Sequence, residues 1–126
     1  MMNNKVAVLG LAALLATAAI AQTGRMRLEG RLAGSAKGKA KWQTRDSASQ
    51  LQAELEIEGE RLTPGATYMV LIGSNLPYSV TANSLGRFTF NQRFNSANRP
   101  SIQVDNVVVV TTDTGTTVMS GVMKRR

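Results

Sequence analysis

From residue 25 onward, polar and apolar side chains alternate one by one along much of the chain. The segments 25–33, 36–44 and 50–58 each show this period of two. Successive side chains of a β-strand point to opposite faces, so this period is typical of strands with one face on a core and the other in water. The sequence shows no stretch with the apolar spacing of an amphipathic helix over three turns. It therefore predicts an all-β protein.

Five further strands are predicted from short apolar runs bounded by turn residues. They cover residues 66–72, 77–82, 87–94, 101–112 (broken at Asp105-Asn106) and 116–123. Pro64 and Gly65 suit the two central positions of a type II turn, and Asp113-Thr114-Gly115 suits a three-residue hairpin loop. Eight short strands separated in this way indicate one small antiparallel domain, a β-sandwich or a barrel, spanning residues 22–126.

The second and third strands are predicted to form a hairpin with Ser47-Ala48 at its tip. The outer face then joins each lysine to a glutamate: Lys41 to Glu54, Lys39 to Glu56 and Lys37 to Glu58. On the inner face Trp42 meets Ala53, so a large residue lies opposite a small one. A slip of one residue would place lysines on the core face, and the alternation excludes that slip.

The composition excludes several kinds of chemistry. The sequence has no Cys and no His, so thiol catalysis, imidazole general bases, Cys or His metal ligands and disulfides are impossible. The glutamates at 54, 56, 58 and 60 alternate along one predicted strand, about 6.7 Å apart, which is too far for one cation to gather three of them. We expect no catalytic residues, no metal site and no cofactor.

Residues 1–21 have the features of a Sec-type signal peptide. Lys5 precedes an apolar run, and Ala19-Ile20-Ala21 matches the small-x-small cleavage pattern. We expect cleavage after Ala21 and export to the periplasm or the extracellular space. An uncleaved membrane anchor or a buried helix is the alternative, although the run is shorter than the roughly 20 residues that span a bilayer.

Basic residues gather near both ends of the exported part. The formal net charge is +7, and the candidate anion-binding residues are Arg25, Arg27, Arg31, Lys124, Arg125 and Arg126. If the first and last strands are neighbours, these side chains form one basic strip that attracts anionic polymers. The alternative is that they keep the protein soluble and protect strand edges from aggregation. Aromatic residues do not alternate with them, so specific nucleic-acid recognition is not expected.

Tyr78 is the one aromatic residue predicted outside a core face, and it is a candidate ligand contact. The alternative is a ring at the rim of the core.

The spacing of glycines and apolar residues carries a family resemblance over about half of residues 22–126. The matching residues are Gly38-Lys39-Ala40-Lys41-Trp42, Leu51 to Ile57, Leu62, Pro64-Gly65-Ala66, Tyr68, Gly86 and Phe88. This pattern resembles the CHRD (chordin-type) β-domain and small exported bacterial domains. The resemblance implies an immunoglobulin-like or related β-sandwich and implies no activity. CHRD domains usually carry His residues after the third strand, where this sequence has Tyr68.

Two functions remain open at this level. One is an exported, non-catalytic β-sandwich that serves as a structural or interaction module for envelope or extracellular proteins. The other is a binding domain for an anionic polysaccharide or similar polymer through the basic strip.

Overall fold

The computed structural model describes residues 25–46 and 51–126 and is all-β over these ranges. Within them no helix is long and apolar enough to cross a membrane. The strands are β2 (Arg25–Gly34), β3 (Lys37–Asp46), β4 (Leu51–Glu60), β5 (Thr67–Ile72), β6 (Tyr78–Thr81), β7 (Phe88–Phe94), β8 (Val107–Thr112), β9 (Thr117–Val122) and β10 (Lys124–Arg125). Every pairing between them is antiparallel.

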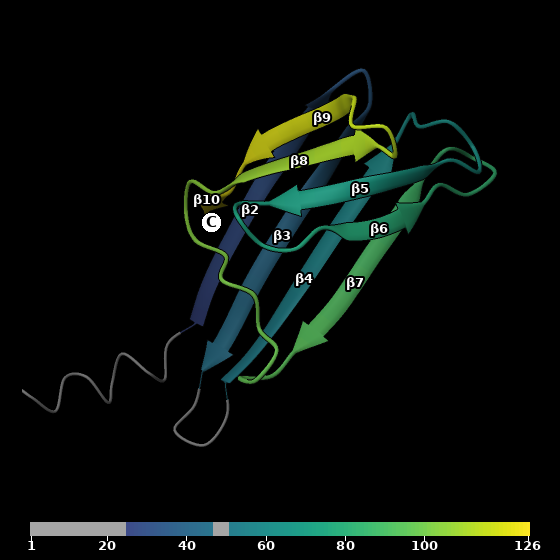
Figure 1. The fold of residues 1–126 in the computed structure, drawn as a ribbon. Helices are drawn as coiled ribbons and strands as arrows, with labels where there is room; N and C mark the ends of the chain where they lie inside the picture. The colour runs from purple at the N-terminus through teal and green to yellow at the C-terminus, as the bar shows by residue number, and fades with distance from the viewer. Residues whose placement is uncertain (1–24, 47–50) are drawn as a thin grey trace, which may run out of the picture.

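One continuous sheet runs in the order β6-β5-β8-β9-β2-β3-β4-β7, and β10 pairs with β2 beside β9. The sheet bends so that β9, β8, β5 and β6 lie over β2, β3, β4 and β7, as two layers of a nearly closed, barrel-like structure (Figure 1). The bend lies where β9 meets β2, through the ladder pairs Ala33↔Ser120 and Gly34↔Met119. A Cβ on Gly121 would lie 2.2 Å from the carbonyl oxygen of Arg31, so this crossing requires glycine.

The core fills the space between the two layers. Trp42 and Leu55 face each other across β3 and β4 and are almost fully buried. The Trp42 ring contacts Phe94 at 6.1 Å between ring centroids. Each buried aliphatic or aromatic side chain of this kind contributes roughly 1.5–3 kcal/mol. The core is therefore built by the inward residues of the alternating pattern, as the sequence predicts.

The strand predictions agree with the structure within two residues at nearly every end. The exception is 101–112, where only β8 forms, because Asp105 adopts a positive φ of 74° and residues 103–106 close a turn. Ile102, in the preceding loop, is nevertheless buried in the core. Strand β10, which pairs with β2, was not predicted as a separate strand.

The predicted register of the β3–β4 hairpin is wrong by two residues. Lys41 pairs with Glu56 rather than Glu54, and Trp42 pairs with Leu55 rather than Ala53. A shift of two residues keeps every side chain on its predicted face, so the alternation alone does not detect it. The predicted tip, Ser47-Ala48, lies outside the described residues.

The two turns predicted from glycine positions are confirmed. Gly65 has a φ of 79°, and Ala66 N–H donates to Thr63 at 3.1 Å, as a type II turn requires. Gly115 has a φ of 96° in the loop between β8 and β9, where Thr112 N–H donates to Thr116 at 2.8 Å.

The loop from 95 to 106 closes one end of the structure. It runs from the end of β7 back to β8 below the shorter strands of the front layer (Figure 1). Arg99 holds it to the end of β3 through an ion pair with Asp46 at 2.8 Å. Asn75 donates to the Ser101 carbonyl at 2.8 Å and accepts from its N–H at 3.2 Å. The loop is thus fixed to both layers.

Charge is distributed unequally between the two layers. Strands β5, β6, β8 and β9 contain no charged residue. Their outward side chains are threonine, serine and half-exposed aliphatic residues such as Met69, Leu71 and Val109. The outward side chains of β2, β3, β4 and β7 include most of the charged residues, and we refer to this surface as the charged face.

Candidate functional site

The charged face is organised in rows that the strand register defines. The first row joins Arg25, Arg45 and Gln52, and the second joins Arg27, Gln43, Glu54 and Arg93. Four exposed arginines therefore lie together where β2 begins and β3 ends. We call these four residues the arginine end: Arg25, Arg27, Arg45 and Arg93.

The arginine end contains a pair of like charges that the fold does not compensate. Arg25 lies directly opposite Arg45 in the β2–β3 ladder. In the described part of the chain, neither residue makes an ion pair with a carboxylate. Like charges directly opposite each other on a sheet are destabilising by roughly 0.2–1 kcal/mol. An anion held between the two guanidinium groups would remove this repulsion.

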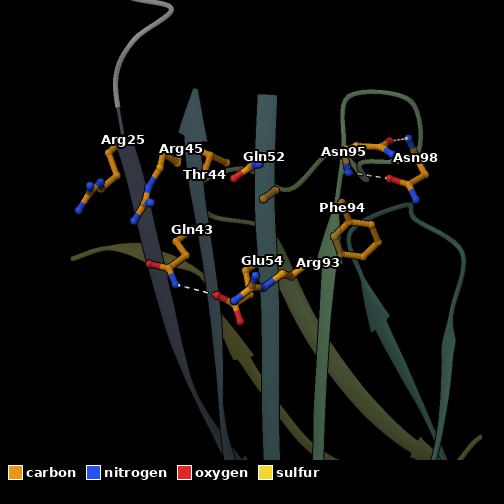
Figure 2. A pocket seen from close by; sticks show the side chains of 11 residues that line it. Arg25, Gln43, Thr44, Arg45, Gln52, Glu54, Arg93, Phe94, Asn95 and Asn98 are labelled. Carbon is orange, nitrogen blue, oxygen red and sulfur yellow. Dashed lines mark hydrogen bonds between the residues drawn. The ribbon is translucent and has the colours of Figure 1, made fainter. Parts of the chain in front are cut away.

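A hollow of about 420 Å³ opens at the arginine end. Figure 2 shows Arg25, Arg45 and Arg93 around it, and among the described residues of its lining Glu54 is the one acid. The Gln43 amide donates to the Glu54 carboxylate at 3.1 Å, which partly satisfies this acid. The hollow therefore has an excess of positive charge.

Two asparagines form the rim of this hollow on the β7 side. The Asn95 side-chain oxygen accepts from Ala97 N–H at 2.9 Å, and the Asn98 side-chain oxygen accepts from Asn95 N–H at 2.9 Å. These bonds fix the loop, and Figure 2 shows those between Asn95 and Asn98. They leave both amide NH₂ groups without a partner among the residues that the structure describes, so each can donate to a ligand.

Two further hollows continue along the charged face, with volumes of about 110 and 730 Å³. The hollow of about 110 Å³ shares Gln43 and Glu54 with the hollow at the arginine end. The hollow of about 730 Å³ begins at Glu29, which pairs in the β2–β3 ladder with Lys41, a lining residue of the hollow of about 110 Å³. The three lie in line along the strand direction. We call them together the outer groove.

The far part of the outer groove is nearly balanced in charge, with four basic and three acidic residues in its described lining. Lys37 pairs with Glu60 at 3.4 Å, and Lys39 approaches Glu29 at 4.0 Å. Within residues 25–46 and 51–126, Glu56 and Glu58 make no ion pair. The outer groove thus has a basic side over β2 and β3 and an acidic stripe over β4.

The basic residues predicted from the sequence lie side by side in the structure. Arg25, Arg27 and Arg31 are exposed on β2, and β10 pairs with β2 at Lys124↔Glu29 and Arg125↔Leu28. Two of the C-terminal cations have carboxylate partners. Lys124 contacts Asp105 at 2.6 Å and Arg126 contacts Glu29 at 2.9 Å. The structure therefore brings the six residues together but leaves Arg25, Arg27, Arg31 and Arg125 as the cations without an ion pair in the described part.

Tyr78 lies apart from the arginine end, on β6 in the other layer. It is half-buried, and its ring packs against Phe90 at 4.9 Å between centroids. Burial raises the pKa of the Tyr78 hydroxyl. Its position is that of a ring at the rim of the core.

Sequence reasoning did not select Arg45 or Arg93 as site residues, nor the amides of Gln43, Gln52, Asn95 and Asn98. Arg45 was detectable in principle, because it is the last basic residue of the alternating β3 pattern. Arg93 joins the site only through the pairing of β4 with β7, which depends on contacts distant in sequence.

No family model matches the chain, and no curated protein matches it either. In the described part, no group of three acidic residues is close enough to hold a metal ion. Guanidinium and amide groups bind anions and hydroxyl-bearing ligands by charge-assisted and neutral hydrogen bonds.

Proposed function

We propose that the protein is an exported, non-catalytic β-sandwich of the immunoglobulin-like kind that binds an acidic polysaccharide through its arginine end. It acts as an interaction module of the cell envelope or extracellular space. The observation that carries this proposal is the Arg25–Arg45 pair beside a hollow with a single acid, Glu54. If these arginines only kept the protein soluble, pairing two of them directly opposite each other would add repulsion without a benefit.

Export supports the choice of ligand. Residues 1–21 have the n-region, apolar run and cleavage pattern of a signal peptide. Outside the cytoplasm, acidic polysaccharides are one class of polyanion that such a surface would meet. The resemblance to CHRD-like exported domains agrees with this setting and assigns no chemistry.

Retention on immobilised polygalacturonate across a salt series tests the proposal. We expect Arg45→Gln to weaken binding about three- to ten-fold, because one charge-assisted contact is lost. The slope of log affinity against log salt concentration should become shallower by roughly 0.7–0.9, which is the contribution of one ionic contact. The matched control is Arg61→Gln, which removes the same charge from an exposed turn that lines none of the three hollows.

Stability separates binding from folding in this experiment. Arg45→Gln removes the repulsion from Arg25, so the variant should be as stable as the wild type or more stable by roughly 0.2–1 kcal/mol. Equal retention of Arg45→Gln and Arg61→Gln would show that only net charge matters. No retention of the wild-type protein at low salt would reject the proposal.

A second candidate function is a structural module that contacts another protein by strand pairing. The observation that favours it is that β6 and β7 stand at the two ends of the strand order. Each end strand offers unpaired backbone groups on one side, which can pair with a partner's strand. Such a contact would be insensitive to Arg45→Gln and would show little dependence on salt.

A further inference from the structure

We infer that the ligand is a hydroxyl-rich acidic glycan that lies along the outer groove, and that more densely charged polymers without hydroxyl donors are disfavoured. This inference rests on the proposed function and deepens it by naming the chemical class of the polymer.

The length of the groove indicates a polymer rather than a small ligand. The three hollows extend from the row of Arg25 to the row of Ala33, eight residues along β2. At about 3.4 Å per residue, this is a span of about 27 Å. A chain laid along the strands would contact all three hollows in turn.

The basic side of the groove selects for acidic groups. Along β2 and β3, the side chains of Arg25, Arg27, Lys41 and Arg45 make no ion pair in the part of the chain that the structure describes. They can therefore each take an anionic group from a ligand without breaking an internal contact. Arginine binds planar carboxylates with two parallel hydrogen bonds.

The acidic stripe selects against dense negative charge and for hydroxyl groups. Glu54, Glu56, Glu58 and Glu60 point outward from β4 along the length of the groove. Ionised carboxylates accept hydrogen bonds and donate none. Sugar hydroxyls supply the donors that they need, whereas a polyphosphate chain supplies only further negative charge. A glycan with both carboxylates and hydroxyls satisfies both sides of the groove.

The test compares oligogalacturonates with linear polyphosphate of matched length, by calorimetry at low salt. The wild-type protein should bind the galacturonate more tightly, with affinity rising until the oligomer spans the groove. In Glu56→Gln/Glu58→Gln, this preference should fall about five-fold or more, as expected from removing two Coulomb repulsions across several ångströms of water. Asp113→Asn is the control, because it removes an acid from the β8–β9 loop, outside the three hollows.

Each result bears on a distinct conclusion. If neither polymer binds, the proposed function fails and the inference with it. If polyphosphate binds as tightly as galacturonate, or if Glu56→Gln/Glu58→Gln leaves the preference unchanged, the glycan assignment is wrong while polyanion binding stands. Affinity that no longer grows beyond a single galacturonate unit would overturn the extended placement along the groove.

Discussion

The crossing of β9 over β2 leaves no room for a side chain at Gly121, so its substitution by alanine should be strongly destabilising. The added Cβ would lie 2.2 Å from the carbonyl oxygen of Arg31, whereas ordinary contact begins at 3.4 Å. The two strands must therefore separate by about 1 Å. The separation falls beside the ladder pairs Ala33↔Ser120 and Gly34↔Met119, which join the two halves of the sheet.

The expected loss follows from these contacts. Overpacking of this kind costs typically about 1–3 kcal/mol, and weakening two backbone hydrogen bonds adds about 0.5–1.5 kcal/mol each at most. We expect Gly121→Ala to lower the free energy of unfolding by about 2–5 kcal/mol, a large share of the ~5–15 kcal/mol that holds a domain folded. Urea unfolding followed by the fluorescence of Trp42, the single tryptophan and almost fully buried, measures this loss.

Gly115→Ala is the control for the loss of glycine itself. Gly115 has a φ of 96° and nothing within 4 Å of an added Cβ. Its substitution should cost only the left-handed backbone penalty, about 1–2 kcal/mol. If Gly121→Ala loses less than Gly115→Ala, the two strands are not closely packed at this crossing and the reasoning is refuted.

Two further predictions concern the end loop and the rim of the core. Asp46→Asn removes the negative charge that holds Arg99, and both side chains are only about one-fifth exposed. We expect the free energy of unfolding, measured in urea, to fall by about 1–2 kcal/mol. An unchanged urea midpoint would mean that the ion pair does not anchor the loop. Burial raises the pKa of Tyr78 above its ordinary value of 10.0, so the folded state holds this proton more tightly than the unfolded chain does. Stability should therefore fall as the pH rises above 10 and through the raised pKa. Tyr78→Phe should remove that part of the fall in an alkaline unfolding series, and an identical pH dependence in both proteins would contradict the assignment.

The alternation of side chains was sufficient to predict the core residues of β3 and β4. Trp42, Leu55 and Ile57 are buried as the period of two requires. The same period explains the error in the hairpin register. A shift by two residues preserves the faces, and the run of alternating glutamates offers each lysine a partner in either register. Local sequence therefore determined the faces of the hairpin but not its alignment.

The candidate site was predictable only in part, because it depends on pairings between distant segments. The clustering of basic residues near Arg25 was visible in the sequence, and the pairing of β10 with β2 places the C-terminal cations beside them. The addition of Arg93 requires β7 to pair with β4, and the rim formed by Asn95 and Asn98 requires a particular loop conformation. Neither follows from a local pattern.

The restriction of strand charge to one layer has a consequence for how the molecule meets its surroundings. Because β5, β6, β8 and β9 carry no charged residue while β2, β3, β4 and β7 carry eight basic and six acidic residues, the excess positive charge of the strands lies in one layer, which gives the molecule an electric dipole across its thickness. Near an anionic surface, this dipole exerts a torque that turns the arginine-bearing side inward before contact. A larger fraction of collisions then begins in a productive orientation, and added salt would slow capture as well as weaken it.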